Sequence, residues 1–225
     1  MSQGTLPFVP AAVIFDMDGL MLDSERSIID CMARAASELG HDLPRALWLS
    51  MVGHGEAVCG DLLDDALGKA QRLELLERAN TLYDAVVAAG VPHRPGIVEL
   101  LDLLDAHRML RAVATSTRRP TALRKLEAAG LLPRFDVVCT SSDVTHPKPA
   151  PDVYLLAASL LGVAPALCLV LEDSPTGVRA ALAAGMHPIQ VPDMLPPDDA
   201  VLALGHTILP SLHDVRRLLG QRLAA

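Results

Sequence analysis

From residue 92 onward, short apolar runs alternate with segments in which apolar residues recur at helical spacing. Short apolar runs bounded by turn residues are typical of strands, whereas a period of three to four residues is typical of helices. This pattern predicts helices over 96–108, 120–130, 150–162 and 174–185, and strands over 110–116, 135–143, 167–173 and 187–191. Alternating strands and helices indicate an α/β fold with a parallel sheet, and the near-continuous apolar strands indicate a sheet covered by helices on both faces.

The N-terminal third departs from this alternation. Residues 11–16 form a further apolar run and predict the first strand, but residues 22–91 carry only helical signals. Pro and Gly residues mark the return to the alternating pattern near residue 92. We therefore expect residues 1–21 and 92–225 to form the core and residues 22–91 to form an inserted α-helical cap. The alternative is that these helices are an ordinary layer of the core.

Within the insertion, the pattern predicts helices over 24–40 and 70–90, and two shorter helices within 44–68. The first begins with Ser24, a residue type that caps helices, and ends at Gly40. Its apolar face is expected to contain Ile28, Ile29, Met32, Ala36 and Leu39.

Composition narrows the possible partners. Aromatic residues make up 3% of the 225-residue chain and the formal net charge is −8, which disfavours the stacking surfaces and basic patches that bind nucleic acid. Four scattered cysteines without a Cys-x-x-Cys pair indicate reduced thiols and a cytoplasmic protein. The apolar segment 5–15 contains two prolines and follows no basic stretch, so neither a signal peptide nor a membrane span is expected. We expect a monomer or weak dimer.

Polar and charged residues follow the ends of four predicted strands. The carboxyl ends of parallel strands meet at one edge of a sheet, where ligands of such folds bind. Taken singly, these residues are ordinary turn hydroxyls, a loop cation and acids at a helix start; together they predict a shared site. The residues are Asp16 and Asp18, then Thr115, Ser116 and Thr117, then Lys148, and finally Glu172 and Asp173.

These residue types suit phosphoryl transfer through an aspartyl-phosphate. Asp16 is the candidate nucleophile, and Asp18 the candidate acid and base, because crowded carboxylates favour keeping one of them protonated. Carboxylates also predict a Mg²⁺ site, since this ion prefers oxygen ligands. The expected metal residues are Asp16, Asp18 through its backbone carbonyl, Glu172 and Asp173. The expected phosphate and substrate contacts are Thr115, Lys148, Gly19, Leu20, Ser116 and Thr117. The alternative role for Lys148 is to steady the Asp16 carboxylate.

Four segments in this order, DMDGL at 16–20, ATST at 114–117, KPAPD at 148–152 and LEDS at 171–174, resemble the motifs of the haloacid dehalogenase-like superfamily. The helical insertion after the first motif is similar to the subgroup that contains small-metabolite phosphatases and β-phosphoglucomutase. The resemblance implies a Rossmann-like core, Mg²⁺ dependence and the roles given above. It implies a phosphatase acting on a small phosphorylated metabolite, such as a sugar phosphate.

Three other activities are compatible with such a core. Dehalogenases of the family need neither the second Asp nor the metal, so Asp18 and Glu172 disfavour that activity. Mutases carry a cap His where ungapped matching places Ile28 here, which favours a phosphatase. A relative that only binds ligands is disfavoured because every core motif residue is present. Candidate substrate contacts outside the motifs are Arg26, His54 and Glu56 in the cap, and Arg118 and Arg119 in the core; His146 shows no ligand-like spacing.

Overall fold

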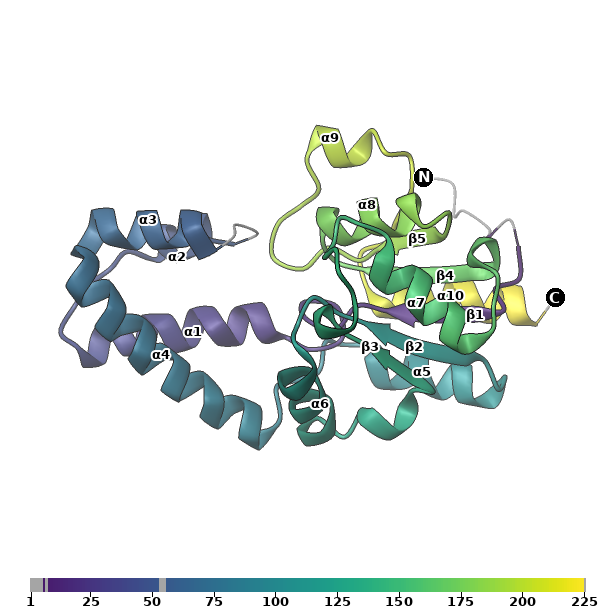
Figure 1. Cartoon of the computed structure of the whole chain (residues 1–225), viewed down its shortest axis with the longest axis horizontal. Coiled ribbons are helices and arrows are strands. Elements are labelled where there is room, and N and C mark those ends of the chain that lie inside the picture. Colours follow the sequence, from purple (N-terminus) through teal and green to yellow (C-terminus); the bar gives the residue numbers. More distant parts are fainter. Residues whose placement is uncertain (1–5, 7, 53–55, 225) are drawn as a thin grey trace.

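The computed structural model describes residue 6, residues 8–52 and residues 56–224. Within this range, a six-stranded parallel sheet has the order β3-β2-β1-β4-β5-β6 (Figure 1). This is the order of a doubly wound Rossmann-like sheet, so the predicted fold class is confirmed. The strands are β1 (Ala12–Phe15), β2 (Leu110–Ala114), β3 (Val137–Cys139), β4 (Cys168–Glu172), β5 (His187–Gln190) and β6 (Thr207–Ile208).

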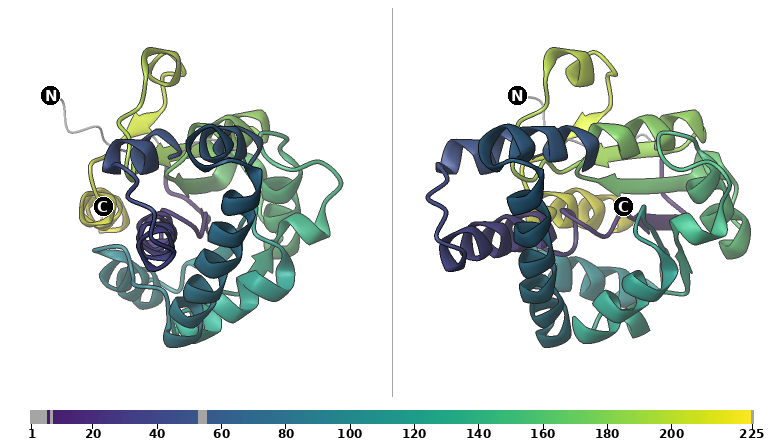
Figure 2. Two further views of the ribbon diagram at one scale, coloured as in Figure 1. Left: turned by 90° about the vertical axis from the view of Figure 1, so that its left-hand side faces the viewer. Right: turned by 60° about the vertical axis from the view of Figure 1, so that its left-hand side comes forward.

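Helices cover both faces of the sheet, as the apolar strands predict. One face packs against α5 (Ile97–Ala106), α6 (Arg119–Ala128) and α10 (Leu212–Leu223). The other packs against α7 (Asp152–Leu161) and α8 (Pro175–Ala183) (Figure 2). The short helix α9 (Asp199–Leu202) lies in the connection between β5 and β6.

Strand β1 illustrates why the central strands are apolar throughout. Successive side chains of a strand point to opposite faces. Val13 and Phe15 enter the cluster beneath α5 and α10, whereas Ala12 and Ile14 enter the cluster beneath α7 and α8; all four are fully buried. Because both faces of the strand are buried, the polar residues of the DMDGL motif lie only where the strand ends.

The first four helices after β1 form a separate group that projects from the core (Figure 1). They are α1 (Ser24–Glu38), α2 (Arg45–Ser50), α3 (Glu56–Leu67) and α4 (Lys69–Ala89). They have their own apolar cluster, in which Trp48, Leu63 and Leu75 are buried. In the described part of the chain, no helix is both long and apolar enough to span a bilayer.

The two chain segments that join this helical group to the core run side by side in opposite directions. Leu22 and His93 form an antiparallel bridge. The Asp23 N–H donates to the Pro92 carbonyl at 2.8 Å, and the Arg94 N–H donates to the Met21 carbonyl at 2.8 Å. Two paired backbone segments therefore connect the helical group to the core.

Two expectations for α1 are wrong. Asp23, not Ser24, is the N-cap residue; Ser24 begins the helix, and its buried hydroxyl has no hydrogen-bond partner in the described structure. The Asp23 carbonyl accepts the first hydrogen bond of the helix, from the Ser27 N–H at 3.3 Å, so the cap lies one residue earlier than expected. Ile28 is 36% exposed and is not part of the apolar cluster of the helical group. The other four residues expected on that face, Ile29, Met32, Ala36 and Leu39, belong to the cluster or pack against it.

Candidate active site

A cavity of about 150 Å³ lies where the predicted site residues follow β1, β2 and β4. Six of the residues expected from the sequence line it: Asp16, Asp18, Thr115, Ser116, Lys148 and Asp173. Three further residues that the sequence did not indicate as contacts also line it: Glu25 of α1, and Ser174 and Thr176 at the start of α8. The cavity therefore brings together the core and the first helix of the insertion.

Lys148 places a buried ammonium group between two carboxylates. Its Nζ donates to Asp16 Oδ1 and to Glu172 Oε1, both at 2.6 Å, and its side chain is 4% exposed. Burial disfavours the charged ammonium, but the attraction of Asp16 and Glu172 outweighs it and raises the pKa of Lys148 well above its ordinary value. Lys148 therefore supplies a positive charge next to Asp16 and Glu172.

Glu172 is fully buried and its carboxylate oxygens accept five hydrogen bonds. The donors are Lys148 Nζ, Tyr154 OH, the Asp173 N–H, the Ser174 N–H and Ser174 Oγ. Burial raises the pKa of Glu172, but Lys148 and these donors outweigh burial and lower it. A Cβ at Gly177 would lie 1.6 Å from Glu172 Oε1, so only glycine fits there. Glu172 thus holds Lys148 and the start of α8 together.

Asp16 and Asp173 are carboxylates with too little positive charge around them. One oxygen each from Asp16, Glu172 and Asp173 lies within 4.8 Å of the others. Burial raises the pKa of Asp16 to about 7, against the opposing effect of Lys148. Burial, Glu172 and Asp16 raise the pKa of Asp173 well above its usual range. A surplus of buried negative charge and an all-oxygen donor set fit a hard divalent cation such as Mg²⁺.

Gly19 and Leu20 belong to the turn after β1 and do not line the cavity. The Gly19 N–H donates to the Leu22 carbonyl at 2.9 Å. A Cβ at Gly19 would lie 2.2 Å from Asp173 Oδ2, so the glycine permits the close approach of that carboxylate. The Leu20 side chain is 1% exposed within the apolar core, which leaves only its backbone for a substrate contact.

Asp18 points toward α6 and both of its carboxylate oxygens accept hydrogen bonds. Thr117 Oγ1 donates to Oδ2 at 2.6 Å, so the Thr117 side chain contacts Asp18. Lys125 Nζ, from α6, donates to Oδ1 at 2.8 Å. Lys125 was not expected from the sequence, because a lysine within a helical segment is usually solvated; here it is 5% exposed.

The other candidate contacts have partners outside the cavity or lie beyond what the structure describes. Arg26 pairs with Asp23 and Asp193. Arg119 pairs with Asp143. His146, which was not a candidate contact, pairs with Asp152. Arg118 is exposed at the N-cap of α6. His54 and the side chain of Glu56 lie outside the described residues.

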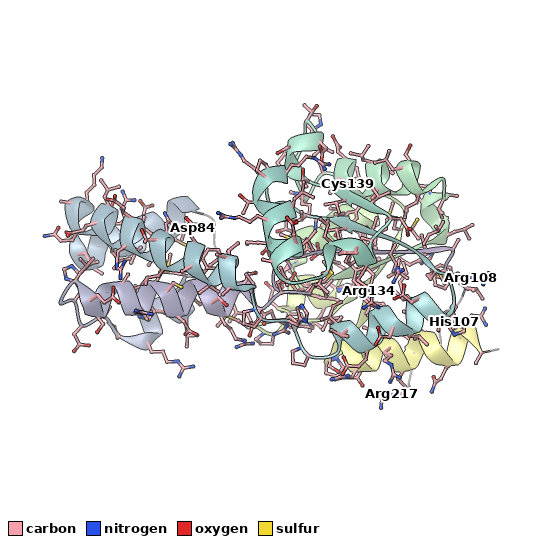
Figure 3. All side chains as sticks on the ribbon, turned by 90° about the horizontal axis from the view of Figure 1, so that it is seen from below. Asp84, His107, Arg108, Arg134, Cys139 and Arg217 are labelled. Carbon is pink, nitrogen blue, oxygen red and sulfur yellow. The ribbon has the colours of Figure 1, made fainter. Side chains whose placement is uncertain are left out.

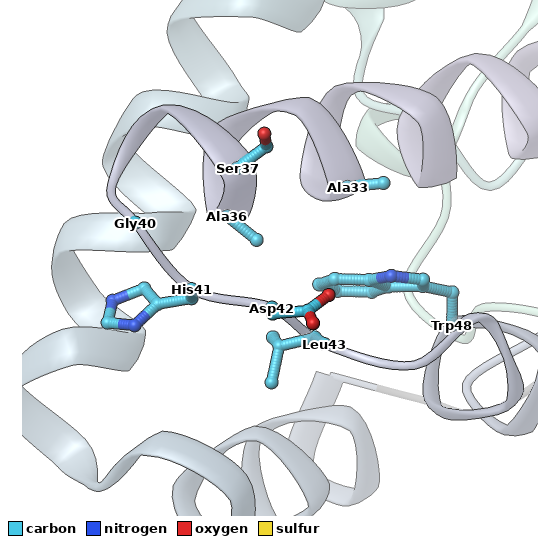
Figure 4. A pocket seen from close by; sticks show the side chains of 8 residues that line it. All are labelled: Ala33, Ala36, Ser37, Gly40, His41, Asp42, Leu43 and Trp48. Carbon is cyan, nitrogen blue, oxygen red and sulfur yellow. The ribbon is translucent and has the colours of Figure 1, made fainter.

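A second cavity, of about 400 Å³, lies in the helical group between α1 and α2 (Figure 4). Trp48 forms one wall, and His41 and Asp42 lie in the connecting loop. Although it is larger, it contains none of the converging carboxylates or Lys148. The smaller cavity therefore carries the chemistry.

Comparison with known proteins agrees with this geometry. The family model described as haloacid dehalogenase-like hydrolase matches residues 13–191. The chain belongs to the haloacid dehalogenase-like hydrolase family. This match confirms the resemblance inferred from the four motifs, and the names of its relatives confirm the expected enzyme class, a phosphatase of this family.

Several family members are similar to this chain over most of its length. A phosphorylated carbohydrates phosphatase of Thermotoga maritima is 32% identical, with 94% of this chain and 99% of the relative covered. Hexitol phosphatase A of Escherichia coli is 35% identical, with 79% and 81% covered. The crystal structure of a family hydrolase from Deinococcus radiodurans, with bound phosphate and sodium, has a TM-score of 0.81 at 30% identity and covers 95% of this chain and 97% of that one.

Proposed function

We propose that this protein is a Mg²⁺-dependent phosphatase that hydrolyses a small phosphorylated sugar or polyol through an aspartyl-phosphate at Asp16. The observation that carries the proposal is the convergence of Asp16, Asp173 and the buried Lys148 ammonium in one cavity. We further propose that residues 22–91 act as a cap over this cavity. The buried thiols of Cys31, Cys139 and Cys168, which form no disulfide, support a cytoplasmic location.

Asp16, Asp173 and the backbone carbonyl of Asp18 would hold the Mg²⁺ ion. Glu172 would support it indirectly, because its own oxygens already accept five hydrogen bonds. When bound, the ion supplies positive charge that lets a phosphate dianion approach the carboxylates. Lys148 adds a second positive charge next to Asp16.

The reaction then has two steps at the phosphorus atom. In the first, an Asp16 oxygen forms a bond to phosphorus while the bond to the substrate's ester oxygen breaks, and Asp18 gives its proton to the departing oxygen. In the second, water attacks the same phosphorus, Asp18 accepts a proton from that water, and the bond to Asp16 breaks. Free phosphate leaves, and both aspartates return to their starting state.

The test is phosphate release by the purified protein from a panel of phosphorylated polyols, sugars and p-nitrophenyl phosphate. We expect hydrolysis in the presence of Mg²⁺, with polyol or sugar monophosphates preferred. Activity should disappear on chelation and return when Mg²⁺ is restored. Undiminished activity after thorough chelation would show that the carboxylate cluster has been given the wrong role, and no hydrolysis of any compound would leave a ligand-binding relative.

A phosphomutase of the β-phosphoglucomutase type is the second candidate, because a core of this kind serves both activities. The partly exposed Ile28 stands where the resemblance to mutases requires a histidine, which favours water as the acceptor. Incubation with a hexose 1-phosphate and a bisphosphate primer separates the two activities. Formation of the hexose 6-phosphate faster than free phosphate would favour the mutase.

Glu25 is the candidate contact for the organic part of the substrate. It lines the cavity from α1, and among the described residues its carboxylate has no hydrogen bond or ion pair. A carboxylate accepts hydrogen bonds strongly from hydroxyl groups. We expect Glu25→Leu to lower kcat/KM for a polyol phosphate about tenfold or more, because a hydrogen bond to a charged group contributes about 1.5–3 kcal/mol.

The measurement is kcat/KM for a polyol phosphate and for p-nitrophenyl phosphate, which has no aliphatic hydroxyl. Only the polyol phosphate should be affected. Glu99→Leu, on α5 in the core and away from the cavity lining, is the matched control and should leave both values unchanged. An equal loss for both substrates would argue against a contact between Glu25 and the substrate's hydroxyl groups.

A further inference from the structure

Lys125 connects the candidate acid and base to the helical insertion. Its ammonium lies 2.8 Å from Asp18 Oδ1 and 5.1 Å from the centre of the Tyr83 ring, which belongs to α4. Burial disfavours the charged form, but Asp18 and Tyr83 outweigh burial and raise the pKa of Lys125. A charged lysine buried at this position thus contacts Asp18 on one side and the insertion on the other.

The donors around Asp18 are not equivalent. An ammonium group has three N–H donors and no acceptor, whereas a threonine hydroxyl both donates and accepts. Oδ1, facing Lys125, must therefore remain an acceptor in every protonation state. Oδ2, facing Thr117 Oγ1, is able to carry a proton because the hydroxyl can turn to accept.

Helix α6 also carries the contacts between the insertion and this side of the core. Arg124, next to Lys125 in the chain, pairs with Asp84 of α4 at 2.6 Å; Figure 3 labels Asp84 on that helix. His93 Nε2 hydrogen-bonds to the Ala129 carbonyl at 2.8 Å. The placement of α4 on α6 therefore sets the position of the Tyr83 ring against Lys125.

We propose that Lys125 is a positioning residue: it orients Asp18 so that Oδ2 exchanges the proton in both steps. This inference rests on the proposed function, since it assigns the orientation of the acid and base in that reaction. Lys125 does not contact the reacting atoms. Its effect is confined to the transfers made by Asp18: the proton given to the departing ester oxygen, and the proton taken from the attacking water.

The test uses p-nitrophenyl phosphate, whose weakly basic phenolate leaves without a proton. Formation of the aspartyl-phosphate from this compound needs no acid, but its hydrolysis still needs a base. In Lys125→Met, we expect the single-turnover rate of phenolate release to stay within about twofold of wild type. Steady-state turnover should fall about tenfold or more, with a burst of one phenolate per enzyme, since correctly placed acid–base groups contribute about 10²-fold or more.

The matched control is Arg124→Met, on the same helix and at the same contact with α4. It breaks the exposed pair with Asp84 but does not reach Asp18, so both rates should stay at wild-type values. Lys125→Gln, which keeps a neutral donor, serves if the methionine variant does not fold and should show the same pattern in weaker form. Lys125→Arg should restore steady-state turnover relative to Lys125→Met.

The outcomes separate this inference from the proposed function. A wild-type protein that releases no phosphate from any substrate overturns the proposed function itself. If the wild type is active but Lys125→Met or Lys125→Gln lowers the rates of both steps equally, the positioning role is wrong. The proposed function then stands. The same pattern of losses in Arg124→Met would assign the effect to the α4–α6 contact and would also overturn the positioning role.

Discussion

Replacing Asp16 with asparagine is expected to lower phosphate release by about 10⁴-fold or more, because an amide oxygen cannot form the covalent intermediate. The structure allows this loss to be separated from unfolding. The new amide oxygen would still accept a hydrogen bond where Asp16 now accepts one from Lys148, and Lys148 would keep its contact with Glu172. The measurement is phosphate release in the presence of Mg²⁺, together with thermal unfolding of the metal-free protein.

The sign of the stability change follows from the pKa of Asp16. Burial raises this pKa from 3.8 to about 7, so the ionised carboxylate opposes folding of the metal-free protein as the pH rises through this interval. At about pH 8, above this interval, Asp16→Asn should therefore be at least as stable as wild type. Asp102→Asn, at an exposed ion pair, is the control and should retain full activity. Wild-type activity in Asp16→Asn would exclude the aspartyl-phosphate.

Replacing Lys148 with methionine is expected to reduce both activity and stability. The buried ammonium is shared by Asp16 and Glu172, and its removal leaves two buried carboxylates without their cation. Breaking a buried pair in this way costs about 3–5 kcal/mol of the free energy of unfolding. Loss of a preorganised charge beside the reacting phosphate should lower kcat by about 10²–10³-fold.

The pH dependence of the stability of Lys148→Met shows whether the variant is destabilised by the lost charge or by lost packing. Protonation neutralises the carboxylates that Lys148→Met leaves without a cation, so the stability deficit of this variant should be smaller at about pH 5 than at about pH 8. Tyr154→Phe is the matched control, because it removes the other donor to Glu172 Oε1 without changing the charge. It should cost about 1–3 kcal/mol and leave kcat within a few-fold of wild type. Equal deficits of Lys148→Met at both pH values would argue against the charge-based account.

The sequence predicts well which residues lie at the ends of the strands that form the site, because the alternation of apolar and charged residues along the chain marks where each strand ends. A strand buried on both faces must be apolar until it ends, which places Asp16, Thr115 and Glu172 at the ends of β1, β2 and β4. Glycine and proline limit the helices, and Ser174 caps α8 by accepting from the Gly177 N–H. The parallel order of the strands then brings these ends to one edge.

Contacts between helices were less predictable. Apolar spacing places Ile28 on the inner face of α1, yet packing against α4 leaves it partly exposed. Spacing also gives no sign that Tyr154 donates to a carboxylate, since a tyrosine on an amphipathic helix usually packs as an apolar residue. Which side chains become partners depends on the distances between helices and strands in the folded protein. The local pattern of apolar residues does not give those distances.

The sequence by itself determined that Asp16, Lys148 and Asp173 follow or flank strands of one parallel sheet, because hydrophobic burial along each strand is a local property of the chain. Only the tertiary structure decided that Glu172 is saturated with hydrogen bonds, that Glu25 reaches the cavity from α1, and that Lys125 holds Asp18. The physical reason is that a charged side chain becomes buried only where a distant segment supplies its partner, and that pairing exists only after the helices have docked.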